Sequence, residues 1–282
     1  MRHLKLLAAA LAASTIAGSA FAADLPSRRA PPVVYAPAPI FTWTGLYVGL
    51  NAGYTWSGKN DISVLTTDTG PGGFTGAQVN GVLPWAVSGA KNDGFIGGGQ
   101  IGYNWQTGSI VFGLEADIQG VAGAKSNQGL FLTAPAFLPV ASTYHRSLDL
   151  FGTVRGRIGF TVTPTFLLYA TGGLAYGQTK LGFSAFGPTW GPPMAVATSV
   201  SKLSAGWTVG AGAEYAFSPN WSAKVEYLYY DLGRLTTPAA AYVYGANLTT
   251  VSTSVRNTGH IVRAGVNYKF GWGAPAPVVA RY

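Results

Sequence analysis

The sequence has no cysteine, few charged residues and, beyond residue 25, no apolar run of the about 20 residues that a membrane-spanning helix needs. Without cysteine the chain can form neither a disulfide framework nor a thiolate metal site. Charged residues make up 10% of the chain and hydrophobic residues 48%, so a surface facing only water would be short of charge. A membrane protein of this kind must satisfy its backbone in a closed β-sheet.

The first 22 residues have the pattern of a secretory signal peptide. Arg2 and Lys5 form a basic end, an apolar core follows, and Ala20-Phe21-Ala22 gives small residues around a cleavage site. Removing this segment leaves 16 Lys and Arg against 10 Asp and Glu, a net charge of +6. This excess suits the anionic lipid and lipopolysaccharide of an outer membrane, and it is too dispersed to indicate nucleic acid.

Proline-rich segments flank the central part of the chain. Residues 23–40 contain five prolines and the pair Arg28-Arg29, which predicts an extended periplasmic tether that meets peptidoglycan through its basic pair. Residues 271–282 form a short C-terminal tail with Pro275 and Pro277. The domain between them, residues 41–270, is predicted to be the folded barrel.

Eight segments of alternating polarity predict the strands of this barrel. They are residues 44–56, 94–106, 109–122, 145–161, 165–182, 203–217, 221–232 and 259–270. Three connections are short turns, and they alternate with four long ones rich in Gly, Thr, Ser, Ala and Pro. The long connections are residues 57–93, 123–144, 183–202 and 233–258. The layout predicts an all-β, eight-stranded antiparallel transmembrane barrel with short periplasmic turns and long extracellular loops.

Aromatic residues beside the short turns fall on the apolar face of the strands. They are Trp105, Phe112, Phe160, Phe166, Phe217, Trp221 and Phe270. Amphipathic side chains gather at the headgroup boundary of a membrane. We therefore expect a periplasmic aromatic girdle.

The opposite, inward face carries nearly all the charge of the strands. Its members are Glu115, Asp117, Asp149, Arg155, Arg157, Glu214, Lys224, Glu226, Arg263 and Lys269. The interior of an eight-stranded barrel is just wide enough for side chains to fill it, and buried charges need partners. The pattern predicts an ion-pair network that plugs the lumen. A narrow conducting path through the same residues is the alternative.

Candidate ligand-binding or catalytic residues are few. His145 and His260 lie toward the long-loop side and could hold a haem at the barrel mouth, but rim histidines are more often plain surface residues. Gly97–Gly102 fits the G-x-G-x-x-G pattern without the helix that a dinucleotide site requires, so we interpret these glycines as thinning a crowded barrel wall. His145, Ser147 and Asp149 share a face but stand too far apart for a hydrolase triad. We predict no metal site, no cofactor and no enzyme.

Four segments resemble one known family. Residues 41–54, 94–105, 154–159 and 262–270 are similar to signature segments of the small outer-membrane β-barrel proteins of alphaproteobacteria, the porin-like surface antigens of brucellae and their rhizobial relatives. The resemblance implies an eight-stranded barrel, surface exposure and a role in envelope integrity, with porin-like and haemin-binding members and no catalytic residues. Such proteins usually stop at the aromatic matching Phe270, whereas this chain continues to Tyr282.

These observations predict a non-enzymatic structural or surface protein of the Gram-negative outer membrane with a charge-plugged lumen. A small porin-like channel, a haemin-binding surface receptor and a soluble β-sandwich or lipocalin-like carrier remain as alternatives.

Overall fold

The computed structural model describes residues 41–58, 62–69, 86–87, 93–134, 137–187, 193–244 and 247–271. The predicted signal peptide, the predicted tether and the tail beyond Gly271 lie outside these residues. Among the residues described, no helix is long and apolar enough to cross a membrane.

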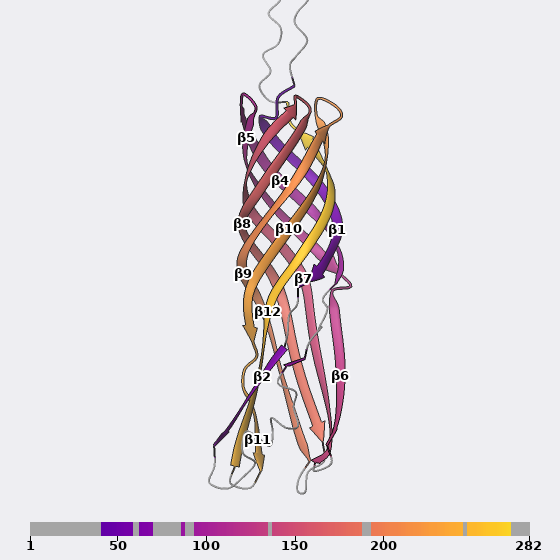
Figure 1. Cartoon of the computed structure of the whole chain (residues 1–282), viewed down its shortest axis with the longest axis vertical. Coiled ribbons are helices and arrows are strands. Elements are labelled where there is room, and N and C mark those ends of the chain that lie inside the picture. Colours follow the sequence, from indigo (N-terminus) through magenta and orange to yellow (C-terminus); the bar gives the residue numbers. More distant parts are fainter. Residues whose placement is uncertain are drawn as a thin grey trace, which may run out of the picture. The chain divides into compact units, whose positions relative to one another are not determined.

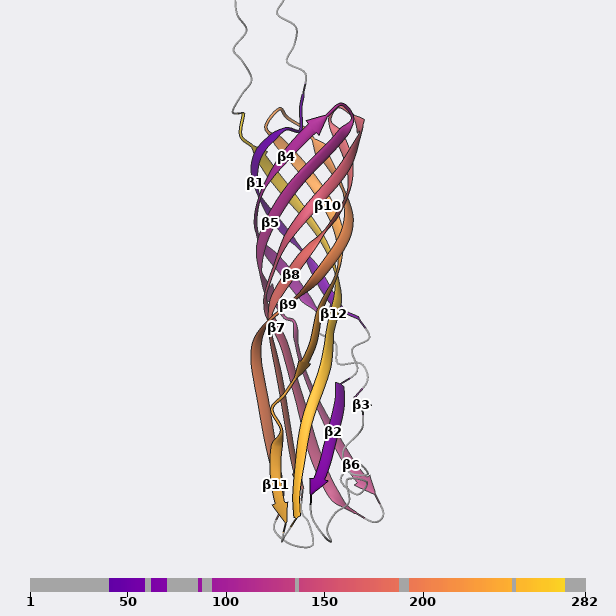
Figure 2. The same ribbon diagram turned by 90° about the vertical axis from the view of Figure 1, so that its left-hand side faces the viewer.

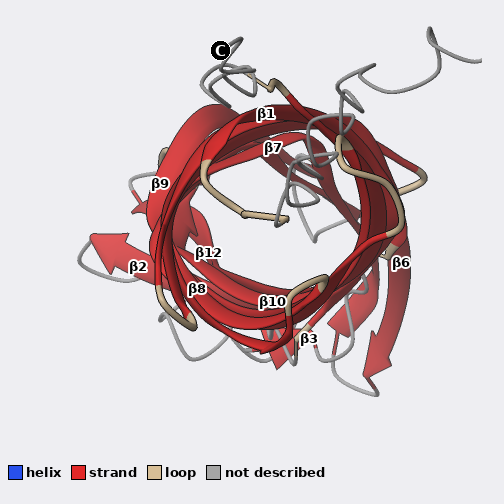
Figure 3. Ribbon diagram, turned by 90° about the horizontal axis from the view of Figure 1, so that it is seen from above, coloured by secondary structure: helices blue, strands red, loops and turns tan. Residues whose placement is uncertain are grey.

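Eight antiparallel strands form a closed ring (Figures 1 and 3). They are β1 (Gly45–Ser57), β4 (Gly94–Thr107), β5 (Ile110–Ala122), β7 (Phe137–Thr163), β8 (Phe166–Gly187), β9 (Met194–Ala216), β10 (Trp221–Thr236) and β12 (Asn247–Lys269). Each pairs with the next in this order, and β1 pairs with β12 from Tyr47↔Lys269 to Ser57↔Gly259. This closure leaves no free edge around the ring and confirms the predicted eight-stranded antiparallel barrel.

The strands form where the sequence alternates, because one face of each strand meets lipid and the other fills the lumen. On β5, for example, Phe112, Leu114 and Ile118 are exposed while Glu115 and Asp117 are buried. Short turns join β4 to β5, β7 to β8 and β9 to β10, all at one end of the ring (Figure 1). The described parts of the other connections lie at the opposite end (Figure 1).

Beyond the ring, the strands continue where the sequence predicted loops. This prediction was wrong for much of the four long connections. Strands β7, β8, β9 and β12 run past the barrel, and they are joined by β2 (Ile62–Thr69), β3 (Ala86–Val87), β6 (Lys125–Ala134) and β11 (Ala240–Tyr244). β6 pairs with β7, and β2 and β11 pair with β12. We call these parts together the outer extension (Figure 2).

The outer extension has an apolar core of its own. Ile62, Leu181, Phe183, Val251 and Val255 are members of one buried cluster. Burial in the same cluster raises the pKa of Tyr144 to about 12. An inner face that excludes water explains why these segments remain paired strands instead of loops.

The first strand starts later than predicted, at Gly45, whose positive φ of 139° suits glycine. The residues before it turn into the mouth of the ring instead of joining its wall. Trp43 is 3% exposed, and its indole Nε1 donates to the carbonyl of Pro164 at 3.1 Å. Tyr47 lies on the inward face of this strand, where it is buried.

Candidate functional site: a charge cluster in the barrel lumen

Eight of the ten predicted inward charges meet in the middle of the ring. We call them the lumen charge cluster, and each is 5% exposed or less. Its members are Glu115, Asp117, Arg155, Arg157, Glu214, Lys224, Glu226 and Arg263. Four acids face four bases, so the cluster is formally neutral. Neutrality is what a buried set of charges requires, because an unpaired charge away from water is costly.

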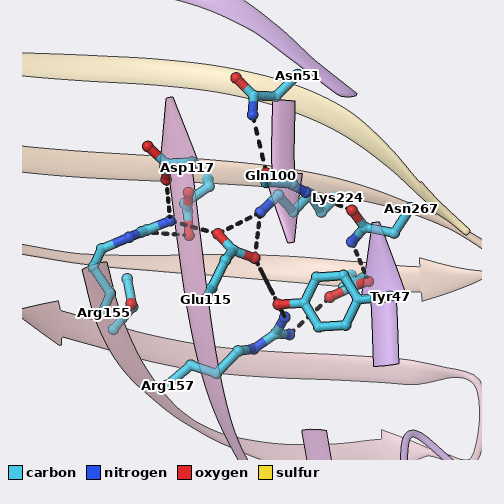
Figure 4. A network of polar contacts seen from close by, with 12 residues as sticks. Tyr47, Asn51, Gln100, Glu115, Asp117, Arg155, Arg157, Lys224 and Asn267 are labelled. Carbon is cyan, nitrogen blue, oxygen red and sulfur yellow. Dashed lines mark hydrogen bonds and ion pairs between the residues drawn. The ribbon is translucent and has the colours of Figure 1, made fainter. Parts of the chain in front are cut away.

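Glu115 lies at the centre of the lumen charge cluster (Figure 4). Both of its carboxylate oxygens lie 2.9 Å from Lys224 Nζ, and Oε1 lies 2.5 Å from Arg155 Nη2. Tyr47 donates its hydroxyl proton to Oε2 at 2.7 Å. Lys224 is on β10, four strands away from β5 in the eight-strand ring, so this ion pair crosses the lumen from one wall to the opposite wall.

Two arginines connect the other acids of the same layer. Arg155 donates from Nη1 to Glu226 at 2.9 Å and from Nη2 to Asp117 at 3.1 Å. Arg263 donates from Nε to Glu226 at 2.8 Å and from Nη2 to Asp117 at 2.9 Å. β7 and β12, which carry these arginines, also face each other across the ring. Each carboxylate is therefore shared between bases from two walls.

A second part of the lumen charge cluster lies nearer the short turns. Arg157 Nη2 binds Glu214 at 2.7 Å, and its guanidinium carbon stands 4.1 Å from the centre of the Tyr169 ring. Glu214 also accepts from Ser222 at 2.6 Å and from Asn267 at 2.8 Å. Stacking on an aromatic ring is a favourable way to bury a guanidinium group.

The predicted network named only charged residues and left out the neutral ones that complete it. Tyr47 and Tyr169 donate to Glu115 and Glu226, and Asn51, Gln100 and Asn267 form a chain of amide hydrogen bonds that ends on Glu214 (Figure 4). Their alternation with apolar neighbours on β1, β4 and β12 was the available signal. The prediction considered only formally charged residues and therefore did not use this alternation.

Apolar layers close the lumen on both sides of the charges. Toward the short turns, Trp43 packs with Val111 and Leu167. Toward the outer extension, Phe151, Leu228 and Ile261 belong to a second buried cluster. A cavity lined by Trp43, Tyr47 and Glu214, among others, has a volume of about 20 Å³, which is room for about one water molecule.

Two predicted members of the network lie elsewhere. Asp149 is the extra residue of a β-bulge between Leu148 and Leu150. The bulge turns Asp149 outward, where it binds Lys180 at 2.7 Å, and it turns Leu148 inward. Lys269 stays at the ring end, where its ammonium binds the Thr42 carbonyl and lies 4.3 Å from the centre of the Phe41 ring. The prediction that these two residues join the lumen network was wrong.

The predicted aromatic residues lie beside the short turns. Trp105, Phe112, Phe160, Phe217 and Trp221 are 45 to 57% exposed. Phe166 and Phe270 are half-buried at the same end. The rings of Trp221 and Phe270 both pack edge-on against the ring of Tyr268, with ring centres 5.1 Å and 5.2 Å away. Exposed aromatic side chains at the short-turn end of a barrel suit the membrane–water interface.

The two histidines lie on opposite walls of the ring, and both face outward. His145 on β7 binds Asn127 of β6. His260 on β12 stacks on Trp56 and binds the Tyr227 hydroxyl at 2.7 Å. Because β7 and β12 are four strands apart in the ring, the two imidazoles cannot hold one haem between them. Nor do His, Asp and Glu residues of the described ranges gather in threes that could hold a metal ion.

Comparison with known proteins gives the family. The family model described as an outer membrane protein beta-barrel domain matches residues 8–270. The 31 kDa outer-membrane immunogenic protein of Brucella melitensis is 38% identical over 95% of this chain and 100% of its own length. The 25 kDa outer-membrane immunogenic protein of Brucella abortus is 29% identical over 96% and 100%. The 22 kDa outer membrane protein of Rhizobium leguminosarum bv. viciae is 37% identical over 48% and 52%.

Solved structures resemble the chain more distantly. Neisserial surface protein A aligns over 80% of this chain and 98% of its own, with 15% identity and a TM-score of 0.34. OprG of Pseudomonas aeruginosa aligns over 80% and 97%, with 11% identity and a TM-score of 0.36. The family match over nearly the whole chain and the closed eight-strand ring agree: the protein is a β-barrel surface protein of the Gram-negative outer membrane and belongs to the outer-membrane β-barrel family of the Brucella 31 kDa and 25 kDa proteins.

Proposed function

We propose that the protein is a non-conducting, non-enzymatic barrel that anchors the outer extension at the cell surface. The observation that carries this proposal is the set of ion pairs that cross the lumen, above all Glu115 with Lys224 and Asp117 with Arg263. An ion on its way through would have to displace these partners, and each separated charge would then be buried alone. Breaking such a pair costs on the order of 3–5 kcal/mol.

The apolar layers on both sides support the same proposal. A hydrated ion leaving the charge cluster would meet Phe151, Leu228 and Ile261 on one side and Trp43 on the other. The side chains of Phe151, Leu228 and Ile261 offer it no hydrogen-bonding partner, and narrow apolar constrictions exclude water from pores. The Brucella relatives are named immunogenic, which fits a protein whose structured part beyond the membrane is presented outward.

Swelling of proteoliposomes tests the proposal. Vesicles carrying the purified barrel in isotonic solutions of small sugars or salts should swell no faster than empty vesicles. A known outer-membrane porin reconstituted at the same protein-to-lipid ratio serves as the positive control. Swelling above the empty-vesicle rate would favour the porin-like alternative.

A further inference from the structure

The outward face of the described strands is free of charge over most of the barrel. Among the residues that the structure describes, the exposed charged side chains of this face lie toward the outer extension. Those with clear outward positions are Lys125, Asp149, Lys180, Arg234 and Arg256. A wide uncharged band followed by a charged rim is the pattern of a barrel that leaves hydrocarbon and enters the headgroup layer.

A row of rings marks this boundary on one side of the barrel. Trp207, Tyr229, His260 and Trp56 come from neighbouring strands β9, β10, β12 and β1, with successive ring centres 5.3 to 5.6 Å apart. From Trp221 beside the short turn to Tyr229 on the same strand, eight residues at the usual rise and tilt span roughly 20 Å of membrane. The row therefore lies near the outer interface.

Just beyond the row, two arginines stand directly opposite each other on paired strands. A β-bulge follows Asp231, with Gly233 at φ 76°, and after it Arg234 pairs with Arg256. Both side chains are exposed on the outward face. Arg256 lies four residues beyond His260, about 10 Å further along the membrane normal, which places both guanidinium groups among headgroups.

One carboxylate, that of Asp231, pairs with Arg256 but not with Arg234. Arg256 donates to Asp231 Oδ2 from Nε at 3.1 Å and from Nη2 at 2.6 Å. Asp231 also accepts the backbone N–H of Gly233 at 2.9 Å, and its side chain is only 4% exposed. Arg234 has no acidic partner among the residues that the structure describes. Like charges opposite each other on paired strands destabilise a sheet. Arg234, Arg256 and Asp231 together carry one positive charge in excess, and a bound anion would neutralise it.

We propose that Arg234 and Arg256 bind a phosphate group of the phosphorylated glycolipid in the outer leaflet. A planar guanidinium matches two phosphate oxygens at once. The bulge and Asp231 fix Arg256 in place, and Arg234 faces it across one strand spacing. The aromatic row below packs against the upper part of the acyl chains. This proposal needs only the membrane location of the barrel, and it is independent of whether the lumen conducts.

Lys125 provides a matched control for the proposed site. It is an exposed cation of the same outer end, on β6 next to β7, away from the β10–β12 pair. Its neighbour across β7 is Lys180, which is already paired with Asp149. Arg234→Gln and Lys125→Gln each remove one exposed charge, so they alter long-range attraction equally. Only Arg234→Gln removes the proposed contact.

Titration of the purified full-length mature protein in a neutral detergent with diphosphoryl lipid A, read by native mass spectrometry, tests the proposal. Arg234→Gln should weaken binding on the order of tenfold, Lys125→Gln should leave it nearly unchanged, and Arg234→Lys should fall between them. Lipid A without its phosphates should bind the wild type and Arg234→Gln equally weakly. Heat-modifiable mobility on gels verifies that each variant is folded.

Two results would overturn the proposal. One is equal binding of diphosphoryl lipid A by Arg234→Gln and Lys125→Gln. The other is inorganic phosphate binding the wild type as tightly as lipid A does, which would assign the two arginines to a soluble anion instead of a glycolipid.

Discussion

Single residues in the lumen charge cluster hold partners from several walls at once. Glu115 illustrates this, because it binds Lys224, Arg155 and Tyr47, and these come from three different strands. Burial makes each partner necessary, since a charge left alone away from water is costly. We therefore expect the stability of the barrel to be sensitive to charges that never meet solvent.

Replacing Lys224 by methionine tests this expectation. The change leaves Glu115 with one cation fewer in a buried site, and it should lower the free energy of unfolding by about 3 kcal/mol. Denaturant unfolding in lipid vesicles, followed by tryptophan fluorescence, gives the value. Lys180→Met is the matched control: its ion pair with Asp149 is exposed, so its loss should cost less than about 1 kcal/mol. Equal losses in the two variants would contradict the assigned role of the cluster.

At the residue scale the sequence predicted most of the charges that face inward but not their pairing, and it missed Arg146, which is 4% exposed. Eight of the ten predicted residues are in the lumen. Asp149 was misplaced because a β-bulge reverses the alternation without any signature in the residues around it. The pairs across the lumen depend on the stagger of strands far apart in the ring. That stagger is set by closure and not by any local segment.

Single elements show how tightly the wall is built around the cluster. On β4, alternate glycines face inward and outward. A Cβ at Gly102 would lie 2.3 Å from the Tyr47 hydroxyl and 2.7 Å from the Leu114 carbonyl, whereas at Gly99 the nearest atom would be 3.8 Å away. Of the glycines in the G-x-G-x-x-G pattern, only Gly102 is explained by the space that Tyr47 occupies, because a Cβ at Gly97 or Gly99 would meet no atom closer than 3.6 Å.

Gly102→Ala should accordingly lower the free energy of unfolding by about 1–3 kcal/mol, because Tyr47 must move away from Glu115. Gly99→Ala, on the same strand, should change it little. The same vesicle unfolding assay measures both variants. A Gly102→Ala protein as stable as the Gly99→Ala protein would show that Tyr47 is not held as the structure describes.

The outer extension was missed because its composition resembles that of loops. Gly182 and Ser184 alternate with buried Leu181 and Phe183, so a period of two was present. Small hydroxyl residues and glycine on the exposed face concealed it. The barrel strands were easier to recognise, since lipid demands large apolar side chains on their outer face.

The absence of native cysteine allows the sidedness of the extension to be measured directly. Ser201 is exposed on β9 in the outer extension, and Thr107 is exposed beside the β4–β5 turn. On intact cells, a maleimide reagent too large to cross the outer membrane should label Ser201→Cys and spare Thr107→Cys. Permeabilised cells should label both. Labelling of Thr107→Cys alone on intact cells would invert the assigned orientation.

For the whole molecule, closed apolar and ionic layers along the lumen account for the proposed role as a surface anchor. The apolar layers at Trp43 and at Phe151 act independently of the ion pairs between them. Loss of one layer should leave the others in place, so Trp43→Ala should be less stable but still closed.

Planar-bilayer recording of the purified barrel tests closure most directly. A closed lumen should give no reproducible stepwise openings for the wild type or for Trp43→Ala, in preparations whose folded insertion is shown by heat-modifiable mobility. Openings of uniform size in the wild type, altered or abolished by Arg155→Gln or Glu115→Gln, would show that ions pass through the lumen charge cluster and would contradict the account.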